Sequence, residues 1–264
     1  MSDVAVGREN TFQGGPVLQM SGIVKRFGGL VALNNVDFQV DAAEVMALVG
    51  DNGAGKSTLI KTVSGAHHPD EGEMLMLGQP VHFRSPQDAW KSGIATIYQE
   101  LALAGKMTVV DNIFLGREIK RPRFGIPFLD RSAMRKRTNE LLRQLDVHVP
   151  SIDSWVEQMS GGQRQGVAIA RALNMDARLI IMDEPTAALA VAEVRKVLDF
   201  VVRLRQQGKS VVLISHNIQD VFEVSDRISV MRHGRCIAVR ETRTTTPQEI
   251  IGLITGANEV RALA

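Results

Sequence analysis

The sequence contains very little cysteine and no long run of apolar residues. Its single cysteine, Cys236, excludes an internal disulfide and is typical of a protein from a reducing compartment. No apolar run approaches the roughly 20 residues that a transmembrane helix needs, and the segment at residues 1–10 lacks the apolar core of a secretory signal. We therefore expect a soluble, cytosolic chain that could act at a membrane only through a partner.

An excess of charge of one sign is also missing. Lys and Arg number 31 against 29 Asp and Glu, which gives a formal net charge of +2 over 264 residues. A dedicated nucleic-acid-binding protein would carry a clear basic excess, so the composition argues against that class. The length and the hydrophobic fraction of 44% predict one large globular domain, or a domain with a subdomain.

Residues 45–58 combine a short apolar run, a glycine-rich loop and the start of a helix. The loop has the pattern Gly-x-x-x-x-Gly-Lys-Ser, formed by Gly50, Gly55, Lys56 and Ser57. Glycines let backbone N–H groups surround phosphates, the lysine supplies a positive charge, and the serine hydroxyl can hold Mg²⁺. The pattern therefore predicts binding of a nucleoside triphosphate. The predicted contacts are Gly50, Asp51, Asn52, Gly53, Ala54, Gly55, Lys56, Ser57 and Thr58.

Further polar side chains follow apolar runs that predict strands, and we expect them at the same edge of the sheet. Asp183 and Glu184 come directly after residues 179–182, so Asp183 suits the shell of Mg²⁺ and Glu184 can deprotonate an attacking water. His216 ends SVVLISH and could bond the γ-phosphate, and Gln99 ends IATIYQ and could bridge Mg²⁺ and the water. The alternatives are a solvated turn for the carboxylates and a structural role for the histidine.

A second helix start has the character of an anion-binding site. Ser160, Gly161, Gly162 and Gln163 precede a helical pattern, so a serine cap and bare glycine amides would lie at its beginning. An ordinary capped helix is the alternative. The chain has two such helix starts but only one phosphate loop. If that loop cannot use both helix starts for its own nucleotide, two chains could pair so that each completes the other's site.

Strand patterns alternate with helix patterns along most of the chain, which predicts an α/β fold with a mainly parallel sheet. Residues 17–40 predict strands of an antiparallel flank, and residues 71–83 predict two more short strands. Residues 101–158 have helical spacing with a loop expected at 120–127. A later helix, at residues 191–208, is expected to have one apolar face. That face would contain Val191, Val194, Leu198 and Val201.

The motifs GDNGAGKST, YQE, MSGGQRQ, LIIMDEP and ISH, in this order, resemble those of the ATPase subunit of an ATP-binding cassette (ABC) transporter. The resemblance implies a phosphate-loop fold that binds ATP and Mg²⁺, with the helix start at Ser160 binding the partner chain's γ-phosphate in a head-to-tail dimer. It also implies that Phe27 stacks on the adenine, although a core aromatic is the alternative. Two departures are Met159, where leucine is usual, and Ala190, where many cassettes carry an aspartate.

The resemblance also divides the chain. It implies a single cassette domain at 15–264, whose ATP-binding core comprises 15–100 and 161–241, while the polar, glycine-rich residues 1–14 predict a flexible tail. A helical subdomain would occupy 101–160 and a C-terminal helix and tail 242–264. The helical subdomain ends in the signature motif MSGGQRQ, which starts at Met159, and the helix that begins at Ser160 is called the signature helix.

Two stretches, at residues 82–103 and 107–118, are similar to importers of monosaccharides such as ribose, xylose, galactose and fructose. In most of those systems two cassettes are fused, so a single cassette implies a homodimer. The expected partners are a multi-spanning sugar permease and, indirectly, an extracytoplasmic sugar-binding protein, at the cytoplasmic side of the cell membrane. An ABC importer for another small solute, a non-transport ABC protein and a phosphate-loop kinase are the rivals.

One charged segment remains outside these motifs. Residues 117–137 contain eight basic residues. A solvated helical face is the favoured interpretation, followed by attraction to anionic lipid headgroups and then by nucleic-acid binding, which the lack of interleaved aromatics disfavours.

Overall fold

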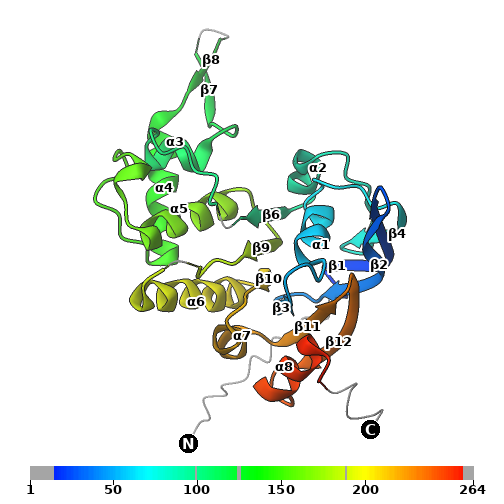
Figure 1. The fold of residues 1–264 in the computed structure, drawn as a ribbon. Coiled ribbons are helices and arrows are strands. Elements are labelled where there is room, and N and C mark those ends of the chain that lie inside the picture. The colour runs from blue at the N-terminus through cyan, green and yellow to red at the C-terminus, as the bar shows by residue number, and fades with distance from the viewer. Residues whose placement is uncertain (1–14, 99, 124–125, 188, 258–264) are drawn as a thin grey trace, which may run out of the picture.

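The apolar run at residues 45–50 is strand β3, near the middle of a six-stranded sheet with the order β12-β11-β3-β10-β9-β6 (Figure 1). The computed structural model describes residues 15–98, 100–123, 126–187 and 189–257. The sheet's strands are β3 (Val45–Gly50), β6 (Ile94–Ile97), β9 (Leu179–Asp183), β10 (Ser210–Ile214), β11 (Arg227–Arg232) and β12 (Arg235–Glu241). All neighbouring pairs are parallel except β11 with β12, which confirms the predicted mainly parallel sheet.

The central strands are covered on both faces. Residues 45–49 are at most 1% exposed, and so are the apolar residues of β9 and β10. Continuous runs of Val, Ile and Leu are typical of parallel strands that helices cover on both faces, whereas a strand with one wet face would alternate. The carboxyl ends of β3, β9 and β10 therefore meet at one edge of a rigid sheet, where their following residues can converge.

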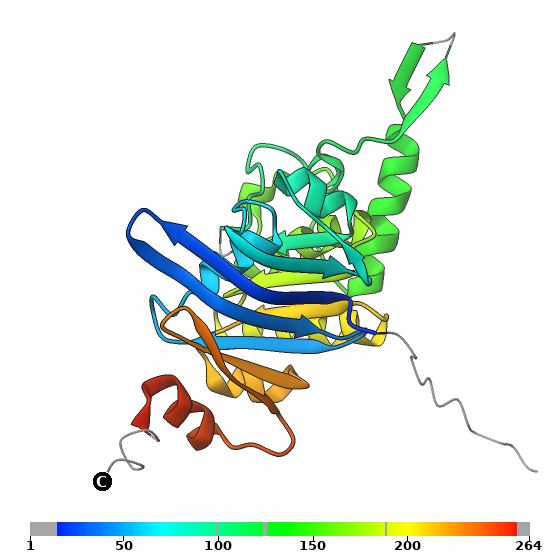
Figure 2. The ribbon, with the colours of Figure 1, turned by 90° about the vertical axis from the view of Figure 1, so that its right-hand side faces the viewer.

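A second, antiparallel sheet packs beside the first (Figure 2). It has the order β2-β1-β4-β5, formed by β1 (Leu18–Phe27), β2 (Leu30–Val40), β4 (Glu71–Met76) and β5 (Gln79–Pro80). One apolar cluster joins both sheets to helix α1 (Lys56–Val63) and includes Met20, Val36, Leu48 and Ile214. The phosphate loop, which connects β3 to α1, thus begins and ends in the same core.

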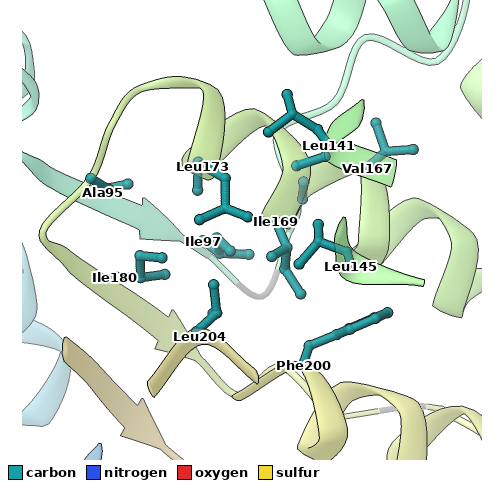
Figure 3. Packing of buried hydrophobic residues seen from close by; sticks show 14 of the residues in the cluster. Ala95, Ile97, Leu141, Leu145, Val167, Ile169, Leu173, Ile180, Phe200 and Leu204 are labelled. Atoms are coloured by element: carbon teal, nitrogen blue, oxygen red, sulfur yellow. The ribbon is translucent and has the colours of Figure 1, made fainter. Parts of the chain in front are cut away.

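The helical part of the chain stands on the side of β6 and β9. Its helices are α3 (Val109–Phe114), α4 (Arg131–Leu145), α5 (Gly161–Asn174) and α6 (Val191–Gln206). Figure 3 shows how their apolar side chains meet the sheet, with Leu145, Ile169 and Phe200 gathered near Ile97 and Ile180. Because these side chains are buried together, α5 and its N-terminus are held firmly against the sheet that carries the phosphate loop.

The loop expected at 120–127 is wrong. Strands β7 (Lys120–Arg123) and β8 (Ile126–Leu129) form a two-stranded hairpin that projects from the helical part (Figure 2). Pro122 and Pro127 argue against strands in the sequence because proline removes a backbone donor. The two prolines face each other in a ribbon that pairs with no further strand of the described residues, so no ladder donor is missed there.

The long helix α6 at 191–206 buries Leu198 and Val201 of its predicted face and half-buries Val194, while Val191 stays exposed. Val191 is 89% exposed, because it lies in the first turn, which extends beyond the packed surface. The buried face consists of Val197, Leu198, Phe200, Val201 and Leu204.

The remaining helices are α2 (Pro86–Lys91), α7 (Ile218–Val224), α8 (Pro247–Thr255) and a short 3₁₀ turn (Val156–Gln158). The sequence pattern did not predict α7. The predicted tail at 1–14 lies outside the described residues.

Within the described residues, no helix has the length and apolarity needed to cross a membrane.

Asn112 in α3 fixes the backbone that precedes this helix. It is fully buried, and its Oδ1 accepts a hydrogen bond of 2.8 Å from the Ala104 N–H. Its Nδ2 donates to the carbonyls of Ala104 and Thr108 at 3.0 Å and of Met107 at 3.3 Å. One amide therefore satisfies the polar backbone groups of a buried turn.

We predict that Asn112→Ala lowers the free energy of unfolding by about 2 kcal/mol, because buried backbone groups lose their partner. The melting temperature should fall by about 5 °C, measured by circular dichroism. The control is Asn139→Ala on α4, an exposed asparagine whose side chain donates to the Arg135 carbonyl. Equal melting temperatures for the two variants would contradict the role given to Asn112.

Candidate functional site

The phosphate loop is held between β3 and the turn that joins β11 to β12. The Gly234 N–H donates to the Ala54 carbonyl at 3.0 Å, and the Gly234 carbonyl accepts from the Asn34 N–H at 2.8 Å. Within the loop, the Ala54 N–H donates to the Asp51 carbonyl at 3.1 Å. These bonds connect the loop to both sheets, so its curvature does not depend on a ligand.

Two glycines of the loop are required by close approaches. A Cβ on Gly50 would lie 2.3 Å from the Met231 carbonyl oxygen, and one on Gly55 would lie 2.8 Å from the Ala32 carbonyl oxygen. Gly55 also has a φ of +102° at the N-terminus of α1, which L side chains rarely adopt. Only glycine lets the chain turn here and leave its N–H groups free of side chains.

The Lys56 side chain is buried and contacts the backbone of the loop. Its Nζ donates to the carbonyls of Gly50 at 2.7 Å and Asp51 at 3.0 Å. Burial lowers the pKa of the Lys56 ammonium, while the nearby carboxylates of Glu184, Asp51 and Asp183 act in the opposite direction. The ammonium is therefore a partly desolvated positive charge at the floor of the loop, where its field is screened least.

The loop and the carboxyl ends of β9 and β10 enclose one cavity. It has a volume of about 500 Å³ and is lined by the loop, by Leu30 to Ala32 of β2, and by Asp183, Glu184 and His216. The structure thus brings residues 52–58 of the predicted loop and three of the predicted polar side chains together, whereas Gly50 and Asp51 are not among the residues that line this cavity. Gln99, also predicted for this edge, lies outside the described residues.

Glu184 and His216 contact each other across the cavity. Glu184 Oε1 lies 2.8 Å from His216 Nε2. The Glu184 backbone has a φ of +49°, and its N–H donates to the Ile214 carbonyl at 3.0 Å, so the turn after β9 is tied to β10. A left-handed backbone at a non-glycine residue is uncommon, and it occurs here at the residue whose carboxylate contacts His216.

The two adjacent carboxylates differ in their surroundings. Burial raises the pKa of the Asp183 carboxyl, and the neighbouring Glu184 charge raises it further, while Lys56 opposes the shift. Asp183 and the hydroxyl-bearing Ser57 line the same cavity. The cavity therefore contains an excess of negative charge next to oxygen ligands.

The helix start at Ser160 is built as the sequence predicts but does not line this cavity. Ser160 Oγ accepts from the Gln163 N–H at 3.3 Å, and Gln163 Oε1 accepts from the Ser160 N–H at 3.0 Å, which is a complete capping box. Ser160 is exposed, and the residues at 160–163 are not among those that line the 500 Å³ cavity. Within one chain, the two predicted anion sites are separate.

A family model described as "ABC transporter" matches residues 33–187. The chain belongs to the ABC transporter family. It is 48% identical over 248 residues to the fructose import ATP-binding protein FrcA of Rhizobium meliloti, which covers 92% of this chain and 95% of that one. It is 45% identical over 239 residues to the xylose/arabinose import ATP-binding protein XylG of Sulfolobus acidocaldarius, which covers 90% and 94%.

The ribose import ATP-binding protein RbsA 1 of Rubrobacter xylanophilus is 46% identical over 241 residues, which make up 91% of this chain but only 47% of that protein. Among solved structures, a nucleotide-free ATP-binding cassette has a TM-score of 0.77 at 27% identity and covers 91% of this chain and 95% of that one. The cassette MJ0796, in a dimeric post-hydrolysis state bound to ADP and Pi, has a TM-score of 0.73 at 26% identity and covers 86% of this chain and all of that one. These likenesses confirm the predicted family and fold.

Phe27 of this cassette is not a core aromatic. It is 43% exposed at the end of β1, and its ring lies edge-on to His67 with centroids 5.2 Å apart. Its backbone pairs with Leu30, which lines the nucleotide cavity, but Phe27 itself is not among the residues that line it. Its stacking on adenine stays a prediction.

The sequence pattern missed two carboxylates that hold the segment following Glu184 in this cassette. Asp220, buried in α7, accepts from Thr186 Oγ1 at 3.0 Å and from Asn217 Nδ2 at 2.9 Å. Glu193, in the first turn of α6, accepts from the Gly162 N–H at 3.2 Å. The Asn-x-x-Asp spacing at 217–220 could have indicated the first, but nothing local indicates that Glu193 reaches another helix.

Ala190, where many cassettes carry an aspartate, is the N-cap of α6 and provides no side-chain acceptor. A carboxylate is nevertheless present in the first turn of α6, on Glu193. The hydrogen bond that it accepts from the Gly162 N–H is the largest cause that lowers the pKa of the Glu193 carboxyl. The segment after the paired carboxylates is therefore tied to the signature helix within the same chain.

We predict that Asp183→Asn stabilises the cassette in the absence of nucleotide. A carboxyl whose pKa is raised by folding holds its proton more tightly in the folded state, so stability is lost as the pH rises from the ordinary aspartate pKa of 3.8 through the raised pKa. Removing this charge should raise the melting temperature at neutral pH and flatten its fall between acidic and neutral pH. The measurement is thermal unfolding with EDTA present.

Asp199→Asn, at an exposed position of α6, is the matched control and should leave the pH dependence unchanged. A lower melting temperature for Asp183→Asn at neutral pH would contradict the unfavourable electrostatics assigned to Asp183.

Proposed function

We propose that this cassette is the ATP-hydrolysing subunit of an importer, and that a dimer of it drives uptake of a monosaccharide through a membrane permease. The observation that carries the proposal is one cavity that contains a phosphate loop, a buried lysine, two adjacent carboxylates and a histidine. These groups are the ones that phosphoryl transfer to water needs: charge on the phosphates, a metal ligand and a base.

The phosphates of ATP bind in the loop at 50–58. Backbone N–H groups of the loop and the positive end of α1 face them, and Lys56 supplies the charge that amides alone do not replace. Lys56 Nζ is already held by two loop carbonyls, so little side-chain entropy is lost on binding. The exposed Phe27 stacks on the adenine beside the rim of the cavity.

Ser57 and Asp183 hold Mg²⁺, with Gln99 as a further ligand. Their oxygen atoms are the ligands that Mg²⁺ prefers, and a divalent cation would offset the repulsion between Asp183 and Glu184 that raises the Asp183 pKa. When bound, the ion neutralises charge on the phosphates. The donor set and the local excess of negative charge both fit this ion.

Glu184 acts as the general base. Its carboxylate accepts a proton from water while the water oxygen bonds to the γ-phosphorus, and the bond from that phosphorus to the bridging oxygen breaks to give ADP and phosphate. His216, 2.8 Å from Glu184, holds this carboxylate in place and offers an imidazole to the γ-phosphate. The left-handed backbone of Glu184 and its bond to β10 fix the base in one position.

Two chains complete each other's sites head to tail. Ser160, Gly161, Gly162 and Gln163 form an anion-binding helix start that does not line the cavity of its own chain, and Ser160 is exposed to a partner. A second copy can place this helix start against the γ-phosphate, which the loop alone leaves open to water. The dimeric state of the related cassette MJ0796 with ADP and Pi supports this arrangement.

The partners are a multi-spanning sugar permease and, through it, an extracytoplasmic sugar-binding protein, so the cassette works at the cytoplasmic face of the cell membrane. Support comes from relatives named as import proteins for fructose and for xylose/arabinose. A groove of about 530 Å³, lined by residues 100–103, Gly161 and Glu184, gives the permease access to both the signature helix and the base.

We predict that Glu184→Gln retains ATP binding and lowers the ATPase turnover by about 100-fold or more, because the water loses its base. Lys56→Ala should instead abolish binding, since the loop loses its buried charge. Binding is measured by titration calorimetry and turnover by phosphate release. Turnover near that of the wild type in Glu184→Gln would remove Glu184 from the mechanism.

We predict that MgATP dimerises the cassette, most visibly in Glu184→Gln, where the nucleotide is not consumed. Adding Ser160→Arg should abolish the homodimer and leave ATP binding to the monomer intact, because a bulky side chain then obstructs both shared sites, whereas a heterodimer with an unsubstituted Ser160 would keep one site open. Sedimentation velocity at saturating MgATP measures the dimer. A cassette that stays monomeric there, alone and with its permease, would refute the shared site.

Sugar uptake tests the importer role itself. Deletion of the gene should abolish uptake of at least one labelled monosaccharide among fructose, xylose, arabinose and ribose, and the wild-type gene but not Glu184→Gln should restore it. Unchanged uptake of all four sugars, or loss of amino-acid uptake instead, would overturn the assignment to monosaccharides.

A further inference from the structure

The hairpin of β7 and β8 lies within the most basic part of the chain. Residues 117–137 contain eight basic and two acidic side chains, so this segment carries a formal charge of +6 in a chain whose total is +2, and the remainder is negative. The basic residues are Arg117, Lys120, Arg121, Arg123, Arg131, Arg135, Lys136 and Arg137. The whole chain is therefore nearly neutral, although residues 117–137 are strongly positive.

The hairpin is a separate projection from the body of the cassette (Figure 2). Its base is closed by a 2.7 Å hydrogen bond from the Asp130 N–H to the Ile119 carbonyl. Its strands pair from Lys120 with Leu129 to Arg123 with Ile126, and within the described residues they join no other sheet. A short two-stranded ribbon without a core beneath it contributes little to the stability of the domain, so its side chains are available for contact with a partner.

Apolar and basic side chains are combined on this ribbon. Ile126, Phe128 and Leu129 are 58%, 48% and 45% exposed. Phe128 lies opposite Arg121 and Leu129 lies opposite Lys120, so each face of the ribbon carries a cation beside an apolar group. Ile126 and Phe128 lie toward the tip of the hairpin and Leu129 lies at its base. Three large exposed apolar side chains on a projection cost free energy in water, and a partner that covers them would recover it.

The charges of the hairpin differ from those of the helix that follows. On α4, Arg131 faces Asp111 at 3.8 Å, Arg137 faces Glu140 at 3.5 Å and Arg135 pairs with Asp153. Among the residues that the structure describes, no carboxylate forms an ion pair with Lys120 or Arg121. The Glu118 carboxyl lies near this charge, since its pKa is lowered first by backbone hydrogen bonds and also by Lys120. Lys136 on α4 likewise forms no ion pair with a described carboxylate, so the ribbon shares its positive charge with α4 and carries it beside the exposed apolar groups.

We propose that this hairpin binds the surface of an anionic lipid bilayer, with Ile126, Phe128 and Leu129 at the boundary of the acyl chains and Lys120 and Arg121 on the lipid phosphates. Charge complementarity and the mixture of apolar and basic side chains fit such a surface. Pro122 and Pro127 remove backbone donors from the ribbon, which disfavours a protein partner that would add a strand to it.

This binding needs neither nucleotide nor permease, so it goes beyond the proposed function. It would orient the cassette at the membrane and raise its local concentration near its permease. None of the described hairpin residues lines the nucleotide cavity, so ATP binding and lipid binding can succeed or fail independently.

The test is sedimentation of the full chain with vesicles of phosphatidylcholine alone, or with about 30% phosphatidylglycerol, a fraction that we choose to give a strong surface charge. We expect about tenfold or stronger binding to the anionic vesicles, which about 0.5 M salt should largely remove. Lys120→Gln with Arg121→Gln should weaken binding by about 25-fold, which is about fivefold for each charge. Ile126→Ser with Phe128→Ser should weaken it by about tenfold even at low salt.

Matched controls separate this surface from general charge or hydrophobicity. Arg84→Gln with Lys91→Gln removes two exposed charges elsewhere, and Ile237→Ser with Val239→Ser removes two apolar side chains that are each 40% exposed on β12. Both should bind as the wild type does, and unchanged melting temperatures confirm folding. Equal binding to both kinds of vesicle, or hairpin variants that bind as the wild type does, would overturn the proposal. Variants that keep vesicle binding but lose copurification with the permease would assign the hairpin to a protein contact instead.

Discussion

The close packing of Gly50 and Gly55 against backbone carbonyls is the constraint on which the nucleotide site depends. Neither position has room for a Cβ, since the Met231 and Ala32 oxygens lie 2.3 and 2.8 Å from where one would be. The carbonyls belong to β11 and β2, which are elements of different sheets. Both sheets thus hold the loop in place. The loop fixes the position of Lys56, and strand β9 fixes that of Asp183. Preorganisation of this kind is what a charged transition state requires.

The segment after Glu184 connects this site to the signature helix. Thr186 is bonded to Asp220 on α7, and Gly162 is bonded to Glu193 on α6. In a head-to-tail dimer the signature of a chain serves the nucleotide of its partner, so these two bonds would connect the base of one site to the anion-binding helix of the other. In the single chain, the Gly162 N–H is occupied by the Glu193 carboxylate, so a partner's phosphate has to displace that carboxylate before it can bind this N–H.

Much of this could be predicted from the sequence because its strongest signals are local. The loop, the strand endings at Asp183 and His216, and the cap at Ser160 each depend on a few adjacent residues and on the order strand, loop, helix. The hairpin at 120–129 was missed because two prolines obscure a ribbon that pairs only with itself among the described strands. Glu193 and Asp220 were missed because their partners are 31 and 34 residues away, a separation that only the packing of α5, α6 and α7 brings together.

The central claim, a nucleotide site shared between two chains, is tested most directly by mixing two defective cassettes. One carries Lys56→Ala and lacks a working loop, and the other carries Ser160→Arg and lacks a working signature. Each alone should be inactive. In the mixture, the loop of the second chain meets the signature of the first, so ATP hydrolysis should return, through one intact site per heterodimer. A mixture that remains inactive at every ratio, or a Ser160→Arg cassette that hydrolyses ATP by itself at the wild-type rate, would contradict the account.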